Sequence, residues 1–251
     1  MKLEVLFTPA EFAALNRRDL SKTTCVVFDI LRATTSMTAA LANGAAAIYP
    51  VLEIADAVAL HKKMPDALLA GERNGLRITA AQTGSVDFDL GNSPREFTSE
   101  RVRGKNIIMT TTNGTRALQA CAGAQQILAA SFLNLKATAA LLTKTKPEHL
   151  LLVCAGTFEE AAYEDTLAAG ALAESIGSLY ESGDFTDSAH MARDIYRAWS
   201  GNLETAFHHS RNARKILSVP ALLEDVAFCR QRDLFDFCAI VKDGQIIRHK
   251  V

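Results

Sequence analysis

The stretch TTCVVFDILRATTS, residues 23–36, joins an apolar run to a polar run at the acid Asp29. The apolar run predicts a buried strand over residues 24–29, and the pattern after it predicts a helix over residues 34–42 that an Asn-Gly pair caps. Arg32 and three hydroxyl side chains lie where the strand is expected to give way to the helix. An acid, a guanidinium group and hydroxyl groups are therefore expected close together at the end of a strand.

The same succession of an apolar run and a helical pattern recurs along the chain. Further strands are expected at residues 46–51, 67–71, 105–110, 125–130 and 149–156, with a hairpin at 237–250. Further helices are expected at 53–64, 114–122, 134–144, 164–180, 188–199, 203–217 and 220–231. This alternation predicts a single α/β domain over residues 1–251, a three-layer α/β/α fold with a largely parallel or mixed sheet. An irregular loop from residue 71 to about residue 105 is expected to be functional.

Composition limits the class of function. The chain has 251 residues, of which 49% are hydrophobic and 22% charged, and its formal net charge is -1. The lack of a basic surplus argues against a nucleic-acid partner, and no apolar stretch approaches the ~18 residues that span a membrane. The five cysteines are scattered and form no CxxC pair, which favours reduced thiols. We therefore expect a cytoplasmic protein with neither a nucleic-acid nor a membrane partner.

Polar clusters follow three of the expected strands: DILRATTS after 24–29, TTNGTRA after 105–110 and GTFEEAAYED after 149–156. In a parallel sheet the carboxyl ends of the strands lie along one edge, where ligands bind. If the sheet is parallel, the three clusters converge. Such convergence supports a binding site more strongly than any one cluster does.

Each side chain of the first cluster has two interpretations. Asp29 is costly at the end of an apolar strand unless a metal ion or another cation neutralises it, but it can also cap the helix. Arg32 offers a planar fork for a phosphate or sulfonate, or it forms a surface ion pair. Thr34, Thr35 and Ser36 can cap the helix, or their hydroxyls can hold an anion together with the first N–H groups of the helix. Thr34 and Thr35 are therefore candidate substrate-binding residues.

The other polar motifs add anion ligands and acids. The motif TTNGTRA predicts either an anion-binding loop of hydroxyl and N–H groups or a plain turn. Its candidate substrate-binding residues are Thr111, Thr112, Asn113, Gly114 and Thr115. The long loop contributes the acid Glu72 and four candidate substrate-binding residues, Arg73, Asn74, Asn92 and Ser93. Glu164 and Asp165 open a helix, where the helix dipole stabilises acids, and a metal-ligand role is the alternative.

Carboxylates, arginines and many small donors in one site are typical of metal-dependent phosphoryl transfer. Carboxylates bind Mg²⁺ through a few oxygens while the phosphate supplies others. We therefore expect Asp29, Glu72 and Asp165 to be catalytic and to bind Mg²⁺, and Arg32 to be both catalytic and substrate-binding. None of the six histidines lies in a strand-end cluster, so a histidine general base is not expected. The expected partner is a small anionic phosphorylated substrate.

The motifs FDILRATTS, GERNG, DLGNSP, TTNGTRAL and CAGT…EDTLAAG occur in this order over nearly the whole chain. Together they resemble the 2-phosphosulfolactate phosphatase (ComB-like) family. The resemblance implies an α/β/α fold, a homodimer, and Mg²⁺-dependent hydrolysis of the phosphate ester of a sulfonated lactate to sulfolactate and phosphate, within coenzyme M biosynthesis. The site residues that it implies are Asp29, Arg32, Glu72, Arg73, Asn92, Ser93, Thr112, Asn113 and Asp165.

Two other functions stay open on the same residues. One is a phosphatase for another small phosphorylated 2-hydroxy acid, and the other is a non-catalytic anion-binding protein. Acids at Asp29, Glu72 and Asp165 favour an enzyme, because a pure anion binder would avoid carboxylates near its ligand. Leu31 stands where haloacid-dehalogenase phosphatases need a second aspartate, which argues against their mechanism. Whether Asp29 attacks phosphorus itself or binds Mg²⁺ while water attacks is also open.

Overall fold

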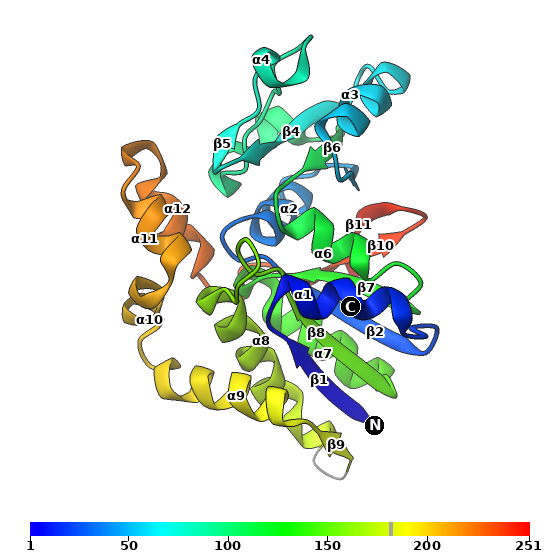
Figure 1. Ribbon diagram of the computed structural model, residues 1–251, viewed down its shortest axis with the longest axis vertical. Coiled ribbons are helices and arrows are strands. Elements are labelled where there is room, and N and C mark those ends of the chain that lie inside the picture. The colour runs from blue at the N-terminus through cyan, green and yellow to red at the C-terminus, as the bar shows by residue number, and fades with distance from the viewer. Residues whose placement is uncertain (181–182) are drawn as a thin grey trace.

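One sheet runs through the molecule, and the computed structural model describes residues 1–180 and 183–251 (Figure 1). In these residues eleven strands follow the order β5-β4-β6-β3-β11-β10-β7-β2-β8-β1-β9. Their bounds are β1 Lys2–Leu6, β2 Thr23–Phe28, β3 Ala47–Pro50, β4 Leu68–Arg73, β5 Leu76–Arg77, β6 Asn106–Thr110, β7 Gln126–Ala130, β8 His149–Cys154, β9 Asp184–Phe185, β10 Phe237–Lys242 and β11 Gln245–Lys250.

Two groups of parallel strands make up most of this sheet. Strands β9, β1, β8, β2 and β7 form the first block, and β3, β6 and β4 form the second block. The hairpin β10–β11 lies between the blocks and pairs antiparallel with β7 on one side and with β3 on the other. Direction reverses at each of these antiparallel pairings, so the two blocks run in opposite directions. The sheet is therefore mixed, and its strands do not all end at one edge.

Helices cover both faces of the sheet, which confirms the three-layer α/β/α fold. Their bounds are α1 Pro9–Ala13, α2 Ala33–Ala42, α3 Ile54–Lys63, α4 Ala80–Thr83, α5 Ser99–Val102, α6 Gly114–Ala120, α7 Leu135–Thr145, α8 Tyr163–Ile176, α9 Asp187–Trp199, α10 Leu203–His209, α11 Arg211–Leu217 and α12 Leu223–Cys229. None of the described helices is long and apolar enough to cross a membrane.

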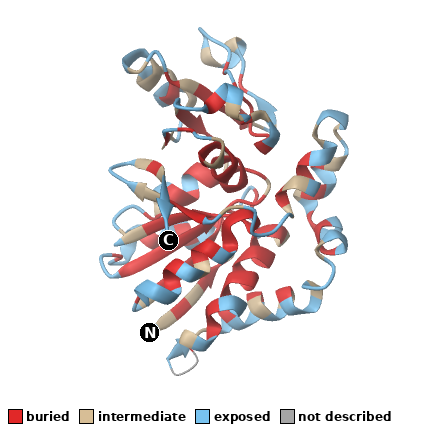
Figure 2. Ribbon diagram, turned by 180° about the vertical axis from the view of Figure 1, so that it is seen from behind, coloured by how far each residue is buried: buried red, intermediate tan, exposed pale blue. Residues whose placement is uncertain are grey.

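The central strand β2 shows how the layers are built. Its side chains alternate between two hydrophobic cores. Val26 and Phe28 pack with residues of α7 and α8, whereas Cys25 and Val27 pack with residues of α1, α2 and α6. All of β2 is buried, as expected for a parallel strand with helices on both faces, and Figure 2 shows the buried residues running through the central strands.

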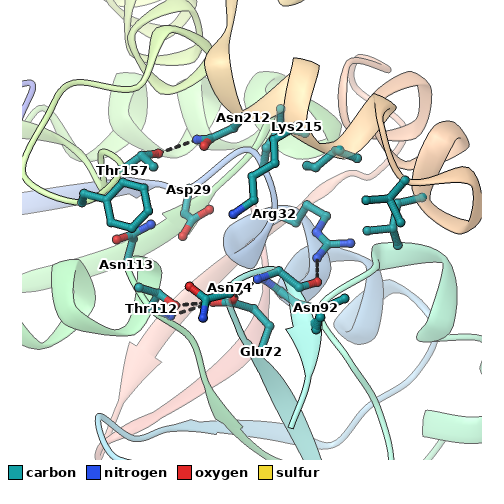
Figure 3. Close-up of a pocket in the computed structure, with 17 residues that line it drawn as sticks. Asp29, Arg32, Glu72, Asn74, Asn92, Thr112, Asn113, Thr157, Asn212 and Lys215 are labelled. Carbon is teal, nitrogen blue, oxygen red and sulfur yellow. Dashed lines mark hydrogen bonds between the residues drawn. The ribbon is translucent and has the colours of Figure 1, made fainter.

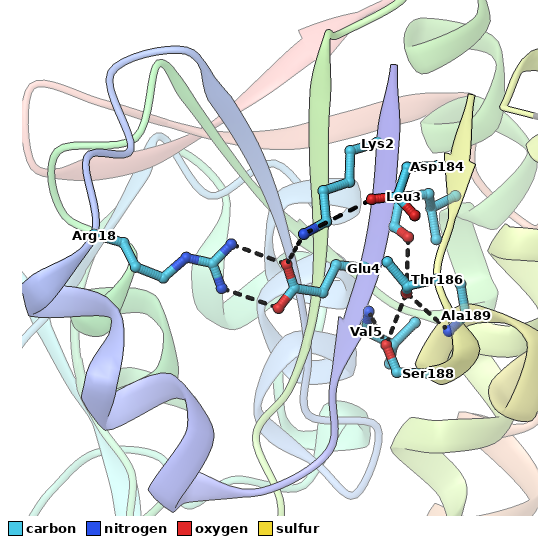
Figure 4. A network of polar contacts seen from close by, with 9 residues as sticks. All are labelled: Lys2, Leu3, Glu4, Val5, Arg18, Asp184, Thr186, Ser188 and Ala189. Carbon is cyan, nitrogen blue, oxygen red and sulfur yellow. Dashed lines mark hydrogen bonds and ion pairs between the residues drawn. The ribbon is translucent and has the colours of Figure 1, made fainter.

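The N-terminal strand β1 was not expected from the sequence. It pairs in parallel with β8 and β9 and lies near an edge of the first block. Polar contacts hold it there (Figure 4): Arg18 donates two hydrogen bonds to the Glu4 carboxylate, and Val5 N donates to Ser188 Oγ. The segment KLEVL alternates charged and apolar residues, as a half-buried strand does, so this alternation could have predicted β1.

Three predicted segments differ in detail from the structure. The stretch 203–217 is two helices rather than one, because Ser210 ends α10 and caps α11 by accepting a hydrogen bond from Ala213 N. The helix predicted to reach residue 180 ends as α8 at Ile176 and is followed by a 3₁₀ turn. The long loop after residue 71 contains the end of β4, β5 and the short helices α4 and α5.

Two helices connect the blocks, and their N-terminal ends meet. Helix α2 leads from β2 to β3, and α6 leads from β6 back to β7. Gly114, the first residue of α6, lies so close to α2 that a Cβ there would be 2.6 Å from Ala33 Cβ and 2.7 Å from Asp29 Oδ2. Glycine permits this approach, which brings the ends of β2 and β6 together although the two blocks run in opposite directions.

Candidate active site

A cavity lies where the ends of β2, β4, β6 and β8 meet the helical arm formed by α10, α11 and α12 (Figure 3). The centres of water molecules can occupy about 110 Å³ of it, which is room for several waters or a small ligand. Its polar lining residues are Asp29, Arg32, Glu72, Asn74, Asn92, Thr112, Asn113, Thr157, Asn212 and Lys215, and its apolar ones include Leu31, Leu76, Phe158, Ile216, Val219 and Leu222. The first seven polar residues were all predicted as site residues.

Asp29 lies between the end of β2 and the start of α2, with 7% of its surface exposed. Its Oδ1 accepts a hydrogen bond from Ala33 N at 3.1 Å, so it satisfies one free N–H group of α2, while Oδ2 accepts none from the described residues. The pKa of Asp29 is raised to about 7, chiefly by burial. The nearby Glu72 and Glu164 carboxylates contribute to this increase, while the Ala33 hydrogen bond and Arg32 oppose it. The residue thus caps the helix in part and keeps one carboxylate oxygen for a ligand.

Glu72, near the end of β4, ties three segments together. Its Oε1 accepts hydrogen bonds from Thr112 N and Thr112 Oγ1, both at 2.8 Å, and its Oε2 accepts one from Gly75 N at 2.7 Å. Thr112 follows β6, so Glu72 fixes the loop after β6 relative to β4. This side chain is buried and lines the same cavity as Asp29.

Arg32 forms an ion pair, but a buried one rather than a surface one. Its Nη1 lies 2.7 Å from Oδ2 of Asp225, and its Nη2 donates to Gly75 O at 2.9 Å. The guanidinium group has five N–H donors, so donors remain for a ligand in the cavity. Asp225, at the start of α12, was not predicted, because acids in the first turn of a helix are common for structural reasons.

Two amide side chains of the cavity have unused oxygens. Asn92 Oδ1 and Asn113 Oδ1 are buried and have no hydrogen-bond partner in the described residues. An amide O and N are assigned from their surroundings, so either group of each amide can face a ligand. Because buried polar atoms in proteins are nearly always paired, two unpaired amides in one cavity indicate that a polar ligand binds there.

Several predicted substrate-binding hydroxyls do not line the cavity. Thr34 Oγ1 donates to Asp29 O, Thr35 Oγ1 donates to Ile30 O, and Ser36 Oγ donates to Asn92 O. These hydroxyls stabilise the turn between β2 and α2. The structure therefore gives no support to anion binding by these three hydroxyls.

Most of the predicted substrate-binding residues after β6 do not line the cavity either. Thr111 and Thr115 are buried, and each accepts a hydrogen bond at its Oγ1 from the backbone N–H of the other. Gly114 does not line the cavity, but its lack of a side chain lets α6 approach Asp29. Of this predicted anion-binding loop, only Thr112 and Asn113 lie at the cavity.

Two further predicted residues support the site from outside. Arg73 turns away and donates to Glu72 O, Leu52 O and Thr110 Oγ1. Ser93 Oγ donates to Asp225 Oδ1 at 2.7 Å and so helps to hold the partner of Arg32.

Asp165 is buried at the start of α8 and does not line the cavity. Its Oδ1 accepts from Ile30 N at 2.8 Å and its Oδ2 from Gly156 N at 3.1 Å, so it ties the end of β2 to the end of β8. Burial raises the pKa of Asp165 well above its ordinary value, and the Glu164 and Asp29 carboxylates add to this effect. Its position is that of a residue that fixes the backbone beside Asp29.

One wall of the cavity comes from the helical arm and was not predicted. Asn212 and Lys215 on α11 line the cavity, and Figure 3 shows the Lys215 side chain extending into it. Glu164 anchors this wall: its Oε2 accepts from Ser210 Oγ and its Oε1 from Asn212 Nδ2, both at 2.6 Å. Burial raises the pKa of Glu164, while these two hydrogen bonds lower it.

The acids predicted to bind Mg²⁺ are not assembled as a set of three. Among residues 1–180 and 183–251, no group of three His, Cys, Asp or Glu side chains could hold a metal ion. Asp29 and Glu72 share the cavity, and both have carboxylate lone pairs left, at Asp29 Oδ2 and at Glu72 Oε2. Mg²⁺ commonly uses one or two carboxylates with the substrate's phosphate oxygens, so this pair fits the ion and Asp165 does not add to it.

Comparison with known proteins identifies the family of this chain. The family model described as 2-phosphosulpholactate phosphatase matches residues 10–244. A protein of Caldanaerobacter subterraneus subsp. tengcongensis named probable 2-phosphosulfolactate phosphatase is 37% identical over 243 residues, which are 95% of this chain and 96% of that protein. Proteins of the same name from Thermotoga maritima and Clostridium acetobutylicum are 38% and 31% identical, and cover 89% and 98% of this chain and 91% and 100% of their own lengths. This chain therefore belongs to the 2-phosphosulpholactate phosphatase family.

Proposed function

We propose that this protein is a phosphoric monoester hydrolase that converts 2-phosphosulfolactate to sulfolactate and phosphate. The observation that carries the proposal is the buried Asp29 carboxylate, which presents a free oxygen to a cavity that also contains Arg32 and Lys215. The family and the names of its relatives indicate the reaction and the substrate. A non-catalytic anion binder is less well supported, because Asp29 and Glu72 would both repel its ligand.

In this proposal Asp29 and Glu72 hold Mg²⁺, which when bound would neutralise charge on the phosphoryl oxygens. The free N–H groups of Arg32 and the amides of Asn92 and Asn113 bind and orient the phosphate. A water oxygen then forms a bond to phosphorus and gives up a proton. The ester P–O bond breaks, and its electron pair leaves on the lactate oxygen, which takes up that proton. We favour attack by water over attack by Asp29, because the free oxygen of Asp29 is assigned to the metal.

Phosphate release from 2-phosphosulfolactate tests the proposal. We expect release in Mg²⁺, loss of release in excess EDTA, and recovery when Mg²⁺ or Mn²⁺ is restored. Full activity in excess chelator would refute the metal assignment. Release from other phosphorylated 2-hydroxy acids but not from 2-phosphosulfolactate would keep the phosphatase and replace the substrate.

The assembly and the location of the protein stay predictions. The homodimer implied by the family is testable by sedimentation equilibrium of the purified protein. The cytoplasmic location and the place of the reaction in coenzyme M biosynthesis are tested by fractionation of cells and by assay of the product in them.

A further inference from the structure

We propose that Lys215 binds an acidic group of the substrate other than the phosphate. Through this lysine, α11 would select substrates that carry such a group. This inference rests on the proposed function, because it concerns a phosphorylated ester that carries at least one more acidic group. No sequence motif pointed to Lys215, which lies in a segment whose pattern predicted only a helix.

The charges at the cavity single out this lysine. Arg32, the other cation of the lining, lies 2.7 Å from the Asp225 carboxylate, and both side chains are almost wholly buried, so its charge is already balanced. Lys215 forms no ion pair with any residue in the described part of the chain. Asp29 and Glu72 add negative charge to the same cavity. Lys215 is therefore the cation of the cavity lining that has no acidic partner, and it is available to an acidic group of the substrate.

Lys215 lies on the side of the cavity that α11 forms. Asn212, Lys215 and Ile216 have the spacing of one helix face, and all three line the cavity. In Figure 3 this face lies across the cavity from Glu72 and Thr112, and Lys215 points toward the space between Asp29 and Arg32. A phosphate bound by Arg32, Asn92 and Asn113, as proposed above, leaves the other end of a small ester to face α11.

The wall that carries Lys215 is held firmly in place. Ser210 caps α11 and also donates to the buried Glu164, and Asn212 donates to the other oxygen of Glu164 and to Thr157 Oγ1. Ile216, Val219 and Leu222 line the cavity beside the lysine.

Two substitutions of Lys215, one control substitution and three esters test the inference. Lys215→Met keeps the aliphatic stem without the charge, Lys215→Arg keeps the charge, and Lys144→Met removes an exposed lysine of α7 as the control. The first ester is 2-phosphosulfolactate. The second is 2-phospholactate, which lacks the sulfonate, and the third is the phosphate ester of 2-hydroxyethanesulfonate, which lacks the carboxylate. Lys215 is exposed, so the melting temperature should change little in either variant.

We expect Lys215→Met to lower kcat/KM for 2-phosphosulfolactate at least ~10-fold, mainly through KM, and Lys215→Arg to restore most of it. One of the other two esters lacks the group that Lys215 binds, and on that ester Lys215→Met should lower kcat/KM less than about 2-fold. If that ester is 2-phospholactate, the bound group is the sulfonate; if it is the other ester, the bound group is the carboxylate. Equal losses on all three esters would show that Lys215 binds the phosphate, and no loss on any would show that it binds nothing. Either result overturns the inference.

A binding measurement separates this inference from the proposed function. Calorimetric titration with sulfolactate needs no turnover, and Lys215→Met should weaken its binding at least ~10-fold while Lys144→Met leaves it unchanged. A wild type that hydrolyses none of the esters but binds sulfolactate through Lys215 refutes the phosphatase and keeps the acid-binding role. A wild type that does not bind sulfolactate at millimolar concentration overturns the inference.

Discussion

Replacing Asp29 with asparagine separates the charge of this side chain from its shape. Asparagine can still accept the hydrogen bond from Ala33 N, since it caps helices as well as aspartate does. In the metal-free protein the pKa of Asp29 is raised, chiefly by burial, from an ordinary value of 3.8 to about 7. Between these two pH values the native state keeps a proton that the unfolded chain has lost, so the free energy of unfolding falls as the pH rises through this window.

The size of the effect follows from the pKa shift. A pKa shift of about three units lowers the free energy of unfolding by roughly 4 kcal/mol above pH 7. Below about pH 4 the side chain is protonated in both states, and this loss does not occur. In a chelator at pH 8, we therefore expect Asp29→Asn to be more stable than the wild type by up to about 4 kcal/mol, with a smaller difference at pH 5. In Mg²⁺ we expect phosphate release to be about 10³-fold slower, a barrier increase of about 4 kcal/mol.

Urea denaturation at pH 5 and pH 8 in EDTA measures the first effect, and phosphate release in Mg²⁺ measures the second. Asp66→Asn is the control, because Asp66 is an exposed acid before β4 and should show neither change. A variant that is no more stable than the wild type at pH 8 would contradict the burial argument. A variant that releases phosphate at nearly the wild-type rate would show that Asp29 is only a helix cap.

Three further substitutions, and one control, test the surroundings of the site. Arg32→Lys replaces the planar fork, whose two nitrogens reach Asp225 and Gly75 O, with a single ammonium group, so we expect turnover to fall at least ~10-fold, as measured by phosphate release. Asp225→Asn leaves the buried Arg32 charge without its partner and should lower the free energy of unfolding by about 3 kcal/mol in urea titrations. Gly71→Ala would place a Cβ 2.1 Å from Thr110 O at a φ of 152°, and should cost about 2 kcal/mol or more, whereas Gly84→Ala, at a positive φ with open space around it, should cost less.

The strand β2 and the polar residues after it could be predicted from the sequence, because both depend on local pattern. A run of apolar residues that ends at an acid predicts a strand end, and Asp29 lies there. Glu72, Asn92 and Thr112 were found for a similar reason: they occur in short polar motifs beside glycine or proline. These motifs mark places where the chain leaves a regular element, and such places line the cavity.

The tertiary structure alone decided which distant residues meet. Arg32 and Asp225 are 193 positions apart, and Asp225 and Lys215 lie in segments whose periodicity predicts a helix but not the neighbour of each helix face. Asp165 shows the converse: its chemistry suits a metal site, but the buried N–H groups of Ile30 and Gly156 needed an acceptor and occupy its oxygens.

The direction of the second block was also decided only by tertiary contacts. Strand direction in a sheet depends on which segments pair, and the hairpin β10–β11, at the far end of the chain, inserts between β7 and β3. A local pattern predicts that each of these segments is extended, but it carries no information about the partner strand. The site forms in spite of this reversal because α2 and α6 begin side by side at Gly114, where a side chain would keep them apart.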